Sequence, residues 1–136
     1  MFNSFSRYQP QLLGILRIVT GLLFLSHGLV KLFGFPPGAQ PGQVELLSVV
    51  GIGGLIELVA GALIMIGLFT RPAAFIASGE MAVAYWGFHF APDNPFPVAN
   101  GGDAAILYCF IFLYFVVAGP GAFSVEGTNR ARATRT

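Results

Sequence analysis

The chain has 136 residues, of which 55% are hydrophobic and 10% are charged, and its formal net charge is +1. This composition excludes a soluble domain with a charged surface, and the mean hydropathy of +0.75 indicates a protein solvated by lipid. The small net charge excludes nucleic acid as a partner, because a phosphate backbone requires a strongly basic face. The single cysteine, Cys109, cannot form an intrachain disulfide or a cysteine-based metal site.

Four apolar segments approach the length of about 20 residues that the core of a lipid bilayer requires. They predict spans over residues 11–33, 44–69, 72–90 and 104–118. Loops rich in glycine and proline separate the spans, and Arg17 within the first span is not typical of a cleaved signal peptide. The sequence therefore predicts an all-α fold, namely one integral membrane domain built as a four-helix bundle, with a solvated basic tail over residues 119–136.

The distribution of arginine predicts the orientation of this bundle. If the four helices alternate, one side of the membrane receives Arg7, Arg71, Arg130, Arg132 and Arg135. The opposite loops carry Asp93 and Asp103. By the positive-inside rule both termini face the cytoplasm. The second span is rich in glycine, which allows close packing of helices, and we expect the bundle to contact lipid and to self-associate as a homo-oligomer.

The first span carries three basic residues, Arg17, His27 and Lys31. At about 100° per residue they fall on one stripe of the helix, so we expect them to face the bundle interior. Each charge near the middle of the bilayer costs at least about 2.5–3.5 kcal/mol, so each requires a partner. Counting along the helices predicts an inner ion pair between Arg17 and Glu80.

The remaining polar residues form a predicted outer layer, which contains His27, Lys31, Glu57, His89 and Tyr108. Glu80 and His89 point about 180° apart on an ideal helix, so the two layers need not share a cavity. Simpler interpretations remain open: Lys31 extends to the headgroups, and Trp86 belongs to an interfacial aromatic belt. Glu57 is harder to explain in this way, because a carboxylate in mid-span needs a partner or a proton-transfer role.

Five sequence stretches together resemble the DoxX family of small bacterial and archaeal four-helix membrane proteins. They are Arg17 with TGLLFLSHGLVKL, then GGLIELVAGALIMIGLFTRPAA, MAVAYWGFH, NGGDAAILY and AGPGAFSVE. The family commonly has Glu after the paired glycines and Asp near the end of the chain. This chain has Asp103 and Glu126 at these positions, so the negative charges are kept. The resemblance implies a location in the cytoplasmic membrane of a prokaryote. It also implies that the chain is part of a redox complex, because family members occur as subunits of thiosulfate:quinone oxidoreductases and quinol oxidases.

The first functional hypothesis is a quinone-interacting subunit of an oxidoreductase complex, with other redox subunits as partners. Glu57 and His27 are then the candidate catalytic residues, with Glu57 relaying a proton. The quinone carbonyls accept hydrogen bonds from Lys31, His89 and Tyr108, and the ring packs against Phe24, Phe88 and Trp86.

Two other functions stay open. The second hypothesis is a non-enzymatic membrane scaffold for soluble redox partners, which explains the small size and the basic tail. The third is a transporter or a haem or metal site at His27 and His89. The sequence disfavours haem or metal, because no cysteine or methionine cluster accompanies these histidines.

Overall fold

The structure, a computed structural model, describes residues 2–128. Within this range the chain is helical and contains no strand, which confirms the all-α prediction. A 3-10 helix, η1 (Phe2–Tyr8), leads into the long α1 (Gln9–Phe33). The remaining elements are α2 (Val49–Ile66), α3 (Thr70–Ala84), the π-helix η2 (Tyr85–His89), the short α4 (Pro97–Asn100) and α5 (Asp103–Ala118).

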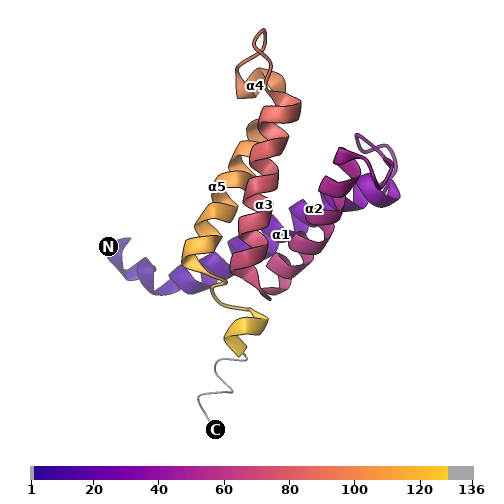
Figure 1. Cartoon of the computed structure of the whole chain (residues 1–136). Coiled ribbons are helices and arrows are strands. Elements are labelled where there is room, and N and C mark those ends of the chain that lie inside the picture. The colour runs from indigo at the N-terminus through magenta and orange to yellow at the C-terminus, as the bar shows by residue number, and fades with distance from the viewer. Residues whose placement is uncertain (1, 129–136) are drawn as a thin grey trace.

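The four longer helices form two crossed pairs. One pair consists of α1 and α2, and the other consists of α3 and α5 (Figure 1). The helices α2 and α3 meet at the turn that connects them and diverge towards the end that carries α4 (Figure 1). The fold therefore contains a wedge between α2 and α3, and the site described below occupies it.

The ends of α2 follow from local sequence. Ser48 caps the helix by accepting a hydrogen bond from the backbone N–H of Gly51 at 3.0 Å. Gly67 ends it in the left-handed conformation (φ 73°), which glycine adopts without steric cost. These two signals make α2 shorter than the predicted span over residues 44–69.

Glycines bring α1 and α2 into backbone contact. A Cβ atom added at Gly21 would lie 2.6 Å from the backbone nitrogen of Met65, and one added at Gly28 would lie 2.6 Å from that of Leu58. No larger residue fits at either position without moving a helix. This close approach is typical of helix packing in membranes, where small residues line the interface.

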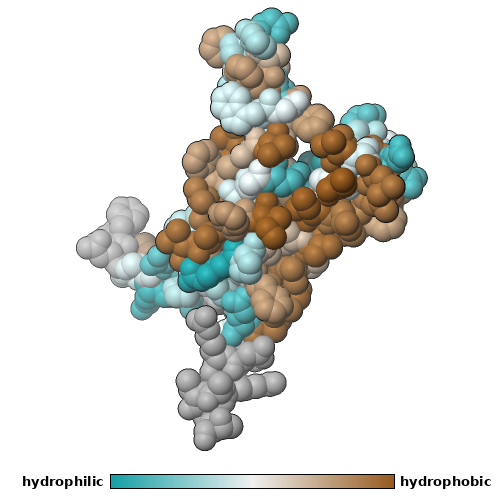
Figure 2. Space-filling view, viewed as in Figure 1, coloured by the Kyte–Doolittle hydropathy of each residue, from teal (hydrophilic) through white to brown (hydrophobic). Residues whose placement is uncertain are grey.

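Hydrophobic side chains cover most of the visible surface (Figure 2). Two helices, Ser4–Phe33 and Val49–Ile66, have the length and hydropathy of membrane spans, and α5 is a shorter apolar helix. Phe24, Phe112 and Phe115 are fully buried and form the centre of the core. The outward-facing apolar residues thus match a lipid solvent.

The first part of the predicted tail, residues 119–128, folds back against the helix ends. The backbone N–H of Ala122 donates to the carbonyl of Pro10 at 2.9 Å. Glu126 accepts a hydrogen bond from the backbone N–H of Thr70 at 2.7 Å, at the start of α3. This capping uses a carboxylate at a helix N-terminus, where the helix dipole favours negative charge. The arginines at 130, 132 and 135 lie outside the described residues.

Candidate functional site

The predicted ion pair between Arg17 and Glu80 is wrong. Arg17 is fully buried, and its guanidinium group donates five hydrogen bonds to backbone carbonyls at 2.6–3.1 Å. The acceptors are the carbonyls of Ile64, Met65, Pro120, Ala122 and Phe123. Arg17 therefore joins the end of α2 to the returning C-terminal segment.

This arrangement follows from the chemistry of helix ends. The last carbonyls of a helix have no partner within the helix, so a buried cation with several N–H groups satisfies them. Phe123 supplies its carbonyl from a left-handed conformation (φ 57°) that is strained for a bulky residue. Residue counting assigned Glu80 to this level because it treated the helices as parallel, whereas the two helix pairs cross (Figure 1).

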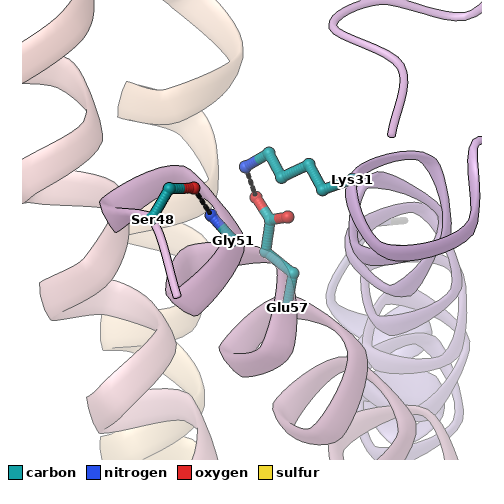
Figure 3. Close-up of polar contacts among 4 residues, drawn as sticks. All are labelled: Lys31, Ser48, Gly51 and Glu57. Carbon is teal, nitrogen blue, oxygen red and sulfur yellow. Dashed lines mark hydrogen bonds and ion pairs between the residues drawn. The ribbon is translucent and has the colours of Figure 1, made fainter. Parts of the chain in front are cut away.

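Lys31 and Glu57 form the ion pair that joins α1 to α2. The Lys31 Nζ atom lies 2.7 Å from Oε1 of Glu57, and the side chains are 17% and 3% exposed (Figure 3). Gly54 makes room for this geometry, since an added Cβ atom there would lie 2.8 Å from Cβ of Lys31. The second carboxylate oxygen of Glu57, Oε2, is buried and accepts no hydrogen bond. The pair thus leaves one buried acceptor unsatisfied.

A cavity of about 810 Å³ lies in the wedge between α2 and α3. Most of its lining is apolar and includes Ile56, Phe75 and Leu113. Its polar groups come from α1, α3, η2 and α5, namely Lys31, Ser78, Glu80, His89 and Cys109. Figure 2 shows hydrophilic atoms inside a hollow that hydrophobic surface surrounds. Concave apolar sites with a few convergent polar groups are typical of ligand-binding sites.

Glu80 is the polar residue of this cavity that lacks a partner within residues 2–128. Its Oε2 atom is buried without a hydrogen bond, and Oε1 faces α2 beside Gly53. The charged groups that act on it electrostatically are those of Glu57 and Lys31. A carboxyl group removed from water without a hydrogen bond is costly, so its position calls for a proton or a ligand.

The π-helix η2 directs His89 into the same cavity. Its wider turn closes with a hydrogen bond from the backbone N–H of Phe90 to the carbonyl of Tyr85 at 2.9 Å. Each residue of a π-helix turns the chain about the helix axis by a smaller angle than a residue of an α-helix does. The π-helix therefore reduces the offset that an ideal α-helix predicts between Glu80 and His89, and both residues line one cavity. The Nδ1 atom of His89 lies 3.2 Å from the carbonyl of Asn100 and donates to it, because a carbonyl only accepts.

Five predicted site residues do not line this cavity, and one of them is Glu57, which is bonded to Lys31. His27 is exposed and meets the ring of Tyr108 edge-on, with 6.0 Å between centroids. Phe24 is buried in the core, 5.5 Å from the ring of Tyr108. Trp86 is exposed and packs against Tyr85, as expected for an aromatic belt. These residues share a helix depth with the cavity, but they lie on other faces of the helices.

Sequence reasoning missed Glu80, Ser78 and Cys109 as neighbours in one cavity. Ser78 donates to the carbonyl of Cys109 at 2.8 Å and so links α3 to α5 beside the cavity. The sequence contained one usable signal, the glycines near Glu80. Gly79 directly precedes it on α3, and Gly53 lies beside its carboxyl group on α2. Among residues 2–128 no group of three or more His, Cys, Asp or Glu side chains is placed to hold a metal ion.

The sequence profile of the DoxX family matches residues 12–90, more than half of the chain. The chain belongs to the DoxX family. An uncharacterized protein of Haemophilus influenzae is 43% identical over 127 residues, which cover 91% of this chain and 95% of the relative. The uncharacterized membrane protein Rv3486 of Mycobacterium tuberculosis is 28% identical and covers 88% and 82%. The inner membrane protein YphA of Escherichia coli is 29% identical and covers 92% and 95%.

No solved structure matches the chain significantly. The DoxX membership and the relatives named as membrane proteins identify an integral membrane protein. The segment that matches the DoxX profile contains the polar cavity residues of α1, α3 and η2, namely Lys31, Ser78, Glu80 and His89. The cavity is thus built mainly from the DoxX region of the chain.

Proposed function

We propose that this DoxX-family protein binds a quinone in the cavity between α2 and α3 and acts as a subunit of a quinone-linked oxidoreductase complex. The observation that carries the proposal is the cavity itself, with apolar walls and polar groups at Lys31, Glu80 and His89. A quinone needs this combination, because its ring and tail are apolar and its two oxygens form hydrogen bonds. The cavity volume of about 810 Å³ falls in the range of small-molecule sites, about 300–1,000 Å³.

The polar groups of the cavity differ in what they offer a ligand. Lys31 uses one N–H on Glu57 and has two more, so it can donate to a quinone oxygen. Glu80 offers a carboxyl group that no residue of the described chain engages. Glu57 holds Lys31 in place from outside the cavity lining. The proposal therefore assigns ligand contact to Lys31, Glu80 and His89, and gives Glu57 a positioning role.

We further propose four membrane spans with both termini in the cytoplasm of a prokaryotic cell. The helices α3 and η2 run on without a break over 15 and 5 residues, together 20, or about 30 Å. Arg7 lies in η1 just before α1, and Arg71 lies in the first turn of α3. Asp93 lies between η2 and α4, and Asp103 begins α5. The start of α3 and α4 lie at opposite ends of the α3–α5 pair (Figure 1). The wedge then opens towards the outer leaflet, where a quinone enters from the lipid.

Two glycines allow a matched test. An added Cβ atom at Gly79 or at Gly87 meets nothing within 4 Å, but only Gly79 lines the cavity. Gly79→Leu should fill the cavity and abolish thermal stabilisation by a short-chain ubiquinone in detergent. Gly87→Leu should leave that stabilisation unchanged. Mass analysis of lipid extracts should find quinone in wild type and not in Gly79→Leu.

The scaffold hypothesis gives a different result. If wild type carries no quinone, and neither glycine variant changes the response to ubiquinone, the cavity is not a quinone site. A protein that docks soluble redox partners without binding quinone then replaces the proposal.

A further inference from the structure

We infer that Glu80 is the residue that recognises the head of the ligand, so that its protonation state sets whether the cavity prefers a quinone or its hydroquinone. This inference rests on the proposed quinone site and adds the chemistry of recognition to it. It also gives Glu80, in place of Glu57, the proton-dependent role at the site.

Each of the other polar residues that line the cavity from α1, α3 and η2 makes at least one hydrogen bond or ion pair. Lys31 Nζ and Glu57 Oε1 bind each other at 2.7 Å, and Glu57 does not line the cavity. His89 donates from Nδ1 to the carbonyl of Asn100, and Ser78 donates to the carbonyl of Cys109. His27 lies outside the cavity, against Tyr108. Glu80 alone lines the cavity with a carboxyl group that has no hydrogen bond within residues 2–128.

The two forms of a carboxyl group recognise different oxygens. An ionised carboxylate only accepts, so it needs a donor such as a hydroquinone hydroxyl. A protonated carboxyl group donates, so it can bind the carbonyl of a quinone, which only accepts. A quinone carbonyl facing an ionised Glu80 would place two acceptors together and leave a buried charge unpaired. One residue therefore gives opposite preferences in its two protonation states.

Charged and titratable groups surround Glu80 on the neighbouring elements. Lys31 from α1, His89 from η2 and Cys109 from α5 line the same cavity, and Glu57 from α2 is bonded to Lys31. The charges of Lys31 and Glu57 offset each other as a bonded pair, so they present little net charge to Glu80. The dependence of ligand preference on pH is consequently centred on Glu80.

The test measures the dissociation constants of a one-isoprenoid ubiquinone and its hydroquinone for the full-length protein in detergent micelles. Titrations run anaerobically from about pH 5 to pH 9, where the hydroquinone stays protonated because a phenol has a pKa of about 10. If each form binds one protonation state of Glu80, the ratio of the quinone Kd to the hydroquinone Kd rises by up to about tenfold per pH unit.

Three variants make the result specific. Glu80→Gln keeps the shape of the side chain but exchanges no proton, so the ratio should become independent of pH. Glu80→Asp keeps the carboxyl group and should retain a pH-dependent ratio. This variant still tests the inference if the glutamine variant folds poorly. Glu45→Gln makes the same change on an exposed loop and should behave as wild type.

The outcomes separate the inference from the proposed function. A ratio that rises with pH in wild type and is flat in Glu80→Gln supports the inference. If both ligands bind and the ratio is flat in wild type, or equally steep in Glu80→Gln, the inference is overturned while the quinone site stands. If neither ligand binds wild type at any pH, the proposed function fails and the inference fails with it.

Discussion

Lys31 and Glu57 hold α1 and α2 together through an ion pair of 2.7 Å at membrane depth (Figure 3). The two residues are 26 positions apart in sequence and on neighbouring helices. Water screens neither charge fully, because the Glu57 side chain is 3% exposed and that of Lys31 is 17% exposed. Removing one partner leaves the other as a buried charge, whereas removing both leaves none.

The first prediction follows from this asymmetry. Lys31→Met should lower the free energy of unfolding by about 3 kcal/mol, because Glu57 becomes an unpaired buried carboxylate. Glu57→Gln in the same protein should recover at least half of that loss. The measurement is a denaturant titration of all four proteins of the cycle in detergent micelles. A coupling energy below about 0.5 kcal/mol would show that the two charges do not stabilise each other.

The second prediction concerns Arg17. Arg17→Lys should cost at least about 3 kcal/mol, because an ammonium group has three donors at one point and cannot reach five carbonyls. Arg71→Lys is the matched control, since Arg71 is exposed and binds two carbonyls, and it should cost less than about 1 kcal/mol. Both are measured by the same denaturant titration.

A second variant distinguishes this role from the ion pair that the sequence suggested. In a double-mutant cycle of Arg17→Gln and Glu80→Gln, the two changes in the free energy of unfolding should add, because Glu80 and Arg17 do not interact. A coupling energy above about 1 kcal/mol would instead indicate an ion pair between them.

The sequence predicted what each helix carries, but it did not predict which faces meet. The helical class followed from apolar segment length, and the likeness to the DoxX family followed from motif order. Counting residues from the membrane edge placed Glu80 beside Arg17, because counting assumes parallel helices. The crossed pairs and the returning segment 119–128, which supplies three of the carbonyls on Arg17, have no local sequence signal.

The π-helix explains the other main error. An α-helical period sets Glu80 and His89 on opposite faces, and the sequence YWGFH gives no visible sign of a wider turn. Phe24 and Tyr108 were predicted to contact the ligand, but they pack in and against the core, because depth alone does not decide whether a side chain faces the core or the wedge. Tertiary packing makes that decision.

The third prediction tests the backbone contact between α1 and α2. Gly28→Ala should destabilise the protein by about 1–3 kcal/mol, because the new Cβ atom meets backbone atoms of Leu58 and Gly54, which cannot rotate away. Gly79→Ala should leave stability unchanged or raise it by up to about 1 kcal/mol, since the position is open and alanine favours helix. Equal effects at the two positions would mean that α1 and α2 are not closely packed in the membrane.

The last prediction fixes the side of the membrane that the cavity faces. In a Cys109→Ser background, an impermeant maleimide should label Ala99→Cys in intact spheroplasts, because Ala99 is exposed within α4 on the predicted outer side. Thr136→Cys, which lies outside the described residues, should be labelled only after lysis. The arginines near one end of the molecule and the aspartates near the other are the reason for this orientation. The reverse labelling pattern would turn the wedge towards the cytoplasm, and the ligand would then have to enter from the inner leaflet.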